Sequence, residues 1–120
     1  MAAKPKKSLV AGVGDIHSGS VVSACPPEVT IHPAGPDKPQ TWLANTVQKA
    51  LHDDLQSYIE QVKSEAKGKR LVVVLLGDLC DGVQHHGSLQ TFGTDSDQVD
   101  IAVEELLPLA NVADDMYGLI

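Results

Sequence analysis

The chain has 120 residues, of which 42% are hydrophobic and 21% charged, so it should fold as one domain or part of one rather than stay disordered. Its net charge of -7 is uneven: residues 1–60 hold five Lys against six acids, whereas residues 61–120 hold four Lys or Arg against ten acids. No basic stripe of the kind that binds nucleic acid is present, so the charge does not indicate a nucleic-acid partner.

The first half of the chain predicts a strand, an irregular segment and a helix. Ser8 to Val13 (SLVAGV) is a short apolar run that predicts a buried strand ending at Gly14-Asp15. Residues 20–40 carry five of the seven prolines and no helical period, which predicts a loop or inserted hairpin that lies over the site built by the preceding loop. Thr41 to Lys67 has apolar residues at spacings of three and four, as in a long amphipathic helix.

The second half repeats the alternation of strand and helix. Leu71 to Leu76 (LVVVLL) is apolar throughout, as expected of a strand covered on both faces. Asp95 and Asp97 are N-cap candidates for a second helix in a solvated first turn, and Pro108 should bend or end that helix. Met116 to Ile120 reads as the start of a third strand. This order predicts an α/β fold, a layered sheet with parallel strands and flanking helices.

Polar residues follow the first two apolar strands directly. The first strand ends in Gly14-Asp15-Ile16-His17 and the second in Gly77-Asp78-Leu79-Cys80-Asp81. Because the carboxyl ends of neighbouring parallel strands meet at one edge of a sheet, Asp15, His17 and Asp78 should converge. Carboxylate and imidazole suit Mn²⁺, Fe or Zn²⁺, and one carboxylate can bridge two ions about 3.5 to 4 Å apart. The glycine before each aspartate should let the backbone turn sharply there.

An Asp-x-His block after one strand and a Gly-Asp-x-x-Asp block after a later strand resemble the first two motifs of the calcineurin-like metallophosphoesterases. The resemblance implies the N-terminal part of that family's four-layer fold, and hydrolysis of a phosphomonoester or phosphodiester by a water activated between two divalent ions. It also implies that Asp15 and His17 bind the first ion, that Asp78 bridges both ions in catalysis, and that Asp81 orients a ligand or the bridging water. Mn²⁺ is the expected metal, with Fe, Zn²⁺ or Mg²⁺ as alternatives.

The family's third block, Gly-Asn-His-Asp/Glu, normally follows the third strand, and it has no counterpart up to Ile120. Asn111 is a poor substitute for its asparagine, because Asn111 precedes that strand. We therefore expect residues 1–120 to form a single partial domain that continues beyond residue 120, and the chain alone to be inactive or impaired. The alternative is a non-catalytic binding or scaffold module on a phosphoesterase fold. Gly82 replaces the arginine of the protein serine/threonine phosphatase branch, which favours small prokaryotic or phage-encoded phosphoesterases as the better comparison.

Other residues leave alternatives open. His85 and His86 follow the second block on a Gly-flanked loop, where they could reach phosphate or metal in catalysis or form an exposed polar loop. His52 is expected on the solvated surface of the long helix, and His32 is expected to be structural. Cys80 is expected to be a small, partly buried residue rather than a nucleophile.

Compartment and partners follow from what the sequence lacks. Cys25 and Cys80 form no CxxC pair, which favours reduced thiols in a cytoplasmic protein. The apolar stretch after the basic N-terminus is too short for a signal peptide or a membrane span. The expected partner is a phosphate ester substrate, no membrane association is expected, and the oligomeric state stays open.

Overall fold

The computed structural model describes residues 7–80 and 92–118. Asp81, His85 and His86 therefore lie outside the described residues, and the predictions made for them stay predictions.

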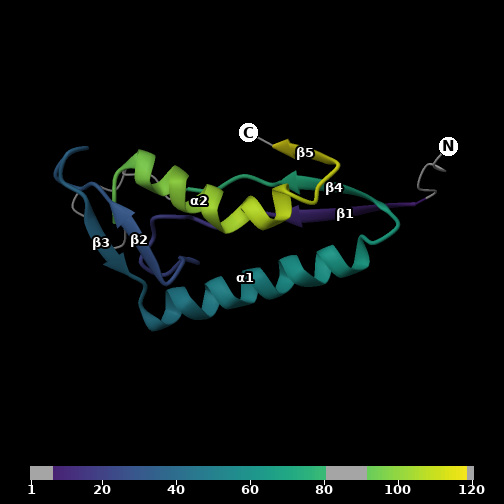
Figure 1. Ribbon diagram of the computed structural model, residues 1–120, viewed down its shortest axis with the longest axis horizontal. Coiled ribbons are helices and arrows are strands. Elements are labelled where there is room, and N and C mark those ends of the chain that lie inside the picture. The colour runs from purple at the N-terminus through teal and green to yellow at the C-terminus, as the bar shows by residue number, and fades with distance from the viewer. Residues whose placement is uncertain (1–6, 81–91, 119–120) are drawn as a thin grey trace.

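A small parallel sheet flanked by two helices forms the centre of the molecule (Figure 1). Its strands are β1 (Ser8–Val13), β4 (Arg70–Leu75) and β5 (Asp115–Gly118), in the order β1-β4-β5. Both neighbouring pairs are parallel. The connections carry the two helices, α1 (Thr46–Glu65) and α2 (Asp95–Ala110). The predicted parallel α/β arrangement is confirmed. Each of the three strands begins within one residue of its predicted first residue.

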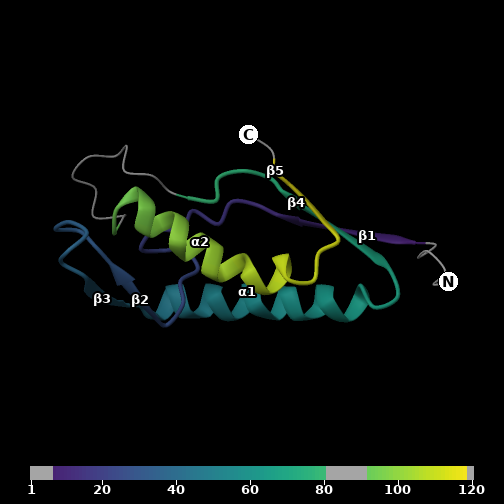
Figure 2. The same cartoon turned by 45° about the horizontal axis from the view of Figure 1, so that its top comes forward.

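Both helices pack on the same face of the sheet (Figures 1 and 2). Alternate residues of β1 and β4 point toward them, as the two-residue period of a strand requires. The buried residues of this core are Ala11, Val13, Ile16, Ile59, Val62, Leu71, Val73, Leu106 and Leu109.

The opposite face of the sheet is not covered by any described helix. Val10 is 65% exposed and Tyr117 is 55% exposed, while Val72 and Val74 are only half-buried. Within residues 7–80 and 92–118, Leu71 to Leu76 is therefore covered on one face only, which differs from the expectation of cover on both faces. An apolar β-branched run suits a buried strand, but it does not reveal whether the same chain supplies the second covering layer.

The proline-rich segment forms a hairpin, and its second strand corrects the predicted start of the long helix. β2 (Glu28–Ile31) pairs antiparallel with β3 (Gln40–Leu43), so Thr41 to Leu43, predicted as helix, are strand. The helix begins later because Asn45 caps it: the Asn45 side chain accepts from the Gln48 N–H, and the Gln48 side chain accepts from the Asn45 N–H. This reciprocal capping box satisfies two otherwise unpaired donors and sets the boundary.

The hairpin packs on α2 through a second core. The buried residues of this core are Cys25, Val29, Ile31, Ala44, Phe92 and Ile101. Trp42 and Phe92 stack with ring centroids 4.3 Å apart, an arrangement worth about 1 kcal/mol beyond its buried area. The hairpin strands thus lie against α2, whereas Ser20, Val22, Ser23 and Ala24, which precede them, line a pocket together with Asp15 and His17 at the end of β1.

The start and end of α2 also differ from prediction. The N-cap is Thr94, and Asp97, three residues later, is the N3 residue of a second capping box and is buried, so it is neither the cap nor part of a solvated turn. Pro108 lies inside the helix, which continues to Ala110. A proline removes one backbone donor to the preceding turn, and here only Leu109 and Ala110 follow it in the helix.

His52 is not on the solvated surface. Its Nδ1 lies 2.7 Å and 3.0 Å from the two carboxylate oxygens of Glu105, whose side chain is fully buried between α1 and α2. The Gln56 amide donates to the same carboxylate at 3.1 Å. Burial raises the pKa of Glu105, and the hydrogen bonds from His52 and Gln56 oppose that shift. The contact between His52 and Glu105 therefore joins α1 to α2.

Hydrogen bonds of Asp97 connect α2 to the hairpin. The Asp97 side chain is 2% exposed and accepts the backbone N–H groups of His32 at 2.8 Å and Thr94 at 2.9 Å, while His32 Nδ1 lies 2.7 Å away. Burial opposes ionisation, but these hydrogen bonds outweigh it and lower the pKa of Asp97 to about 2. The structural role predicted for His32 is consistent with these contacts.

Asp97→Asn should lower the free energy of unfolding by about 2 kcal/mol at neutral pH. The folded pKa lies below the ordinary value of 3.8, so ionised Asp97 stabilises the protein above that pH, and the effect is lost as the pH falls toward 2. Denaturant unfolding between pH 7 and pH 2 measures both effects. Asp95→Asn is the matched control, because Asp95 is exposed in the same helical turn. An equal loss in both variants would contradict the assignment.

Candidate metal centre

The two motif loops are joined to each other by their backbones. Beyond the paired strands, four hydrogen bonds continue the connection: Leu76 N–H to Val13 O (2.8 Å), Asp15 N–H to Gly77 O (3.1 Å), His17 N–H to Asp78 O (2.9 Å) and Ser18 N–H to Leu79 O (2.8 Å). The side chains that follow β1 and β4 are therefore held at fixed relative positions before any ligand binds.

The two motif glycines act differently from each other. Gly77 has φ 96°, a conformation that glycine adopts at no steric cost. Gly14 does not have positive φ; a Cβ there would lie 2.8 Å from Leu76 Cβ, so glycine is needed for the close approach of the two loops. The turn predicted at the first glycine occurs instead at the aspartate that follows it.

Asp15, His17 and Asp78, called the triad from here on, all have left-handed backbone conformations. Their φ angles are 60°, 51° and 50°, and they are the only non-glycine residues with positive φ in the described part of the chain. Each such residue costs on the order of 1 kcal/mol, and this cost is typically retained where a side chain must be aimed at a functional site.

The triad places three ligand atoms close together. One ligand atom from each residue lies within 4.8 Å of the others, and His17 Nε2 lies 2.9 Å from Asp15 Oδ1. The Asp15 side chain is 82% exposed and that of His17 41%, so the group is open to solvent. Two carboxylates and an imidazole suit a divalent transition metal with open positions for water or substrate.

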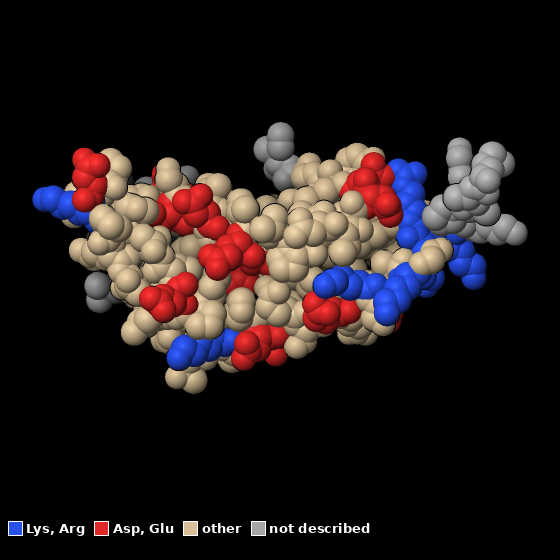
Figure 3. Space-filling view, viewed as in Figure 1, with Lys and Arg blue, Asp and Glu red and all other residues tan. Residues whose placement is uncertain are grey.

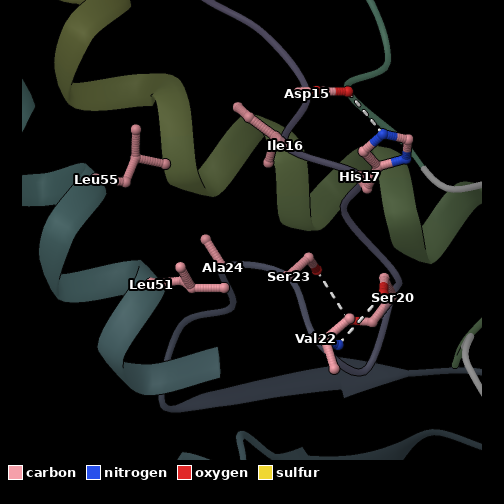
Figure 4. Close-up of a pocket in the computed structure, with 9 residues that line it drawn as sticks. All are labelled: Asp15, Ile16, His17, Ser20, Val22, Ser23, Ala24, Leu51 and Leu55. Atoms are coloured by element: carbon pink, nitrogen blue, oxygen red, sulfur yellow. Dashed lines mark hydrogen bonds and ion pairs between the residues drawn. The ribbon is translucent and has the colours of Figure 1, made fainter. Parts of the chain in front are cut away.

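Two hollows flank Asp15. One has a volume of about 360 Å³ and is lined by Gly14, Asp15, Leu76, Gly77 and Asp78. The other, called the α1 pocket, has a volume of about 310 Å³ and lies beside Asp15 and His17 (Figure 4). Among the described residues of both linings there is no Lys or Arg. Many of the basic side chains seen in Figure 3 lie instead at the end of the molecule where α1 ends and β4 begins.

The sequence did not indicate which residues hold in place the segment that forms one wall of the α1 pocket. Gln48 is fully buried in α1, and its amide donates to the Ser20 carbonyl at 3.1 Å. The Asn45 amide donates to the Val21 carbonyl at 2.7 Å. The spacing Asn45-x-x-Gln48 is a capping-box signal that could have located the helix start. Its second use, holding the segment beside the triad, depends on tertiary contact.

The cysteines take no part in the triad. Both are free thiols, and burial, followed by the charges of Glu105 and Glu104, raises the pKa of Cys25 to about 12. Burial also raises the pKa of Cys80, which is partly buried. Both groups are therefore poor nucleophiles near neutral pH, as predicted for Cys80.

Comparison with known proteins gave no match to a family model, a curated protein or a solved structure. Support for the resemblance to metallophosphoesterases therefore comes only from the residues of this chain and their arrangement. Among the described helices, none is long and apolar enough to cross a membrane.

Proposed function

We propose that the triad binds a divalent cation in a metal-dependent phosphoesterase site, within the N-terminal part of a four-layer metallophosphoesterase fold. The observation that supports this most is the coincidence of strain and proximity. The three described non-glycine residues with left-handed backbone are the same three whose ligand atoms lie within 4.8 Å of one another.

The proposed metal ligands come from two loops and have different roles. Asp15 and His17 come from one loop and Asp78 from the other, and the backbone hydrogen bonds between the loops keep them in register. The described linings of the hollows beside them contain no Lys or Arg to neutralise a phosphate. Held by these residues, a divalent ion, with Mn²⁺ as the proposed metal, would supply that positive charge and would lower the pKa of a bound water for attack on the phosphoryl group. Asp78, with two oxygens and high exposure, is the proposed bridge to a second ion.

The test is hydrolysis of p-nitrophenyl phosphate and bis(p-nitrophenyl) phosphate with added Mn²⁺. A Mn²⁺-dependent rate above that of buffer is expected; it will be low because three residues hold one ion. Asp78→Asn should abolish it. Asp53→Asn, on the exposed surface of α1, makes the same change of charge away from the triad and should have no effect. Equal Mn²⁺-dependent rates above that of buffer in wild type and Asp78→Asn would remove Asp78 from the mechanism.

A second candidate is the binding or scaffold module, which an apolar surface favours. Between α2 and β5 lies a hollow of about 350 Å³ whose lining is wholly apolar and includes Val103 and Leu107. These two residues are 55% and 49% exposed. Exposed apolar patches of this kind occur at interaction surfaces. Absence of both Mn²⁺ binding and Mn²⁺-dependent hydrolysis would favour this candidate.

A further inference from the structure

The α1 pocket lies directly beside the triad. Asp15 and His17 belong to its lining, so a phosphoryl group held at the triad has this pocket as one of its two neighbouring hollows. In Figure 4 the side chains of Asp15 and His17 point toward each other, and Ala24, Leu51 and Leu55 lie across the pocket from them.

The wall away from the triad is apolar. It includes Ala24, Leu51 and Leu55, which lie across the pocket from Asp15 and His17 (Figure 4), while Ile16, between those two residues in the chain, and Val22 add further apolar lining. Leu51 is 39% exposed and Val22 62%, so apolar surface remains available to a ligand in this pocket. Burying such surface favours binding by about 25 cal/mol per Å².

The two serines of the lining are already engaged in the local turn. Ser23 Oγ donates to the Ser20 carbonyl at 2.8 Å, and Ser20 Oγ accepts the Val22 N–H at 3.2 Å. These bonds hold the segment in shape. The pocket thus recognises a ligand mainly by apolar contact, with hydroxyl groups in a secondary role.

The described lining of this pocket carries no positive side chain for a second anionic group. Neither Lys nor Arg is among the described lining residues. The cation proposed at the triad offsets Asp15 and the phosphoryl group itself, so a further phosphate or carboxylate in the pocket would have no counter-charge of its own. The volume of about 310 Å³ is at the small end for ligand sites and fits one ring with short substituents.

We propose that the α1 pocket binds the uncharged, apolar alcohol portion of the substrate, so that the site prefers simple aryl or alkyl phosphoesters over nucleotides and phosphopeptides. This inference rests on the proposed function, because it takes the triad as the phosphoryl position. Leu51 is its specificity-determining residue, since it is apolar, exposed to the pocket and outside the metal ligands.

The experiment compares two non-hydrolysable probes on the Mn²⁺-loaded chain by calorimetry. Benzylphosphonate should bind roughly tenfold more tightly than methylphosphonate, because its ring buries apolar surface. Leu51→Lys should remove most of this advantage. Val47→Lys is the matched control, because Val47 is 51% exposed on the same helix and does not line the pocket. It should retain the tenfold preference, and both variants should bind Mn²⁺ as wild type does.

The outcomes separate the two claims. If Mn²⁺ binds but the two probes bind equally, the pocket is not the alcohol site and the proposed function is unaffected. A benzyl preference that survives Leu51→Lys would likewise overturn the assignment to this pocket. If wild type does not bind Mn²⁺, the proposed function fails and the inference fails with it.

Discussion

Asp78→Asn should lose Mn²⁺ binding and yet unfold no more easily than wild type when metal is absent. Without a cation, the Asp78 carboxylate lies in a group of closely spaced ligand atoms that includes a second carboxylate, Asp15, and the two repel each other. Asparagine removes that repulsion, keeps the shape of the side chain and tolerates φ 50° at least as well as aspartate. Loss of a metal ligand should weaken Mn²⁺ binding by about 100-fold or more, since loss of an outer partner alone costs 10- to 100-fold.

Thermal or denaturant unfolding with and without Mn²⁺ measures both effects. At a free Mn²⁺ concentration near 100 times the dissociation constant, wild type should gain about 2.7 kcal/mol and Asp78→Asn almost nothing. Asp78→Ala isolates the backbone strain. Alanine, like asparagine, removes the repulsion between the carboxylates, but it adopts left-handed φ less readily than asparagine does. The Asp78→Ala variant should therefore be about 1 kcal/mol less stable than Asp78→Asn. Asp53→Asn should match wild type throughout. Unchanged Mn²⁺ stabilisation in Asp78→Asn would contradict the metal centre.

Gly19→Ala should be strongly destabilising, by about 2 to 5 kcal/mol. Gly19 has φ 100°, which alanine rarely adopts, and a Cβ there would lie 2.3 Å from the Cγ and Cδ of the fully buried Gln98. The Gly19 carbonyl also accepts the Phe92 N–H at 2.8 Å, so the backbone cannot shift freely. Backbone strain of about 1 to 2 kcal/mol and overpacking of about 1 to 3 kcal/mol therefore add.

Gly35→Ala separates these two contributions. Gly35 has φ 114°, but a Cβ there meets nothing within 4 Å, so only the backbone strain remains. Denaturant unfolding should show a loss of about 1 to 2 kcal/mol for Gly35→Ala and a clearly larger one for Gly19→Ala. In the Gly19→Ala background, Gln98→Ala should recover part of the difference by making room. Equal losses in both glycine variants would show that the predicted clash is relieved without cost.

The sequence determined the elements whose pattern is local. The apolar runs of β1 and β4, the helical period of α1, and the polar residues that follow each strand are all readable in order along the chain. They were sufficient to predict the parallel sheet and the meeting of Asp15, His17 and Asp78, because parallel neighbouring strands bring their carboxyl ends to one edge whatever the details of packing.

Tertiary structure decided the features that depend on distant segments. Apolar spacing alone extended the long helix back to Thr41, whereas the pairing of β3 with β2 and the Asn45 cap set its start at Thr46. The sequence predicted a solvated His52, whereas in the folded protein α2 brings Glu105 within hydrogen-bonding distance of it. The role of Gly14 depends on Leu76, 62 positions later (76 - 14). The uncovered sheet face and the α1 pocket have no local pattern at all. Burial, left-handed backbone and pocket shape are properties of contacts between segments, so a linear pattern specifies the residues that can form a site but not the surfaces around it.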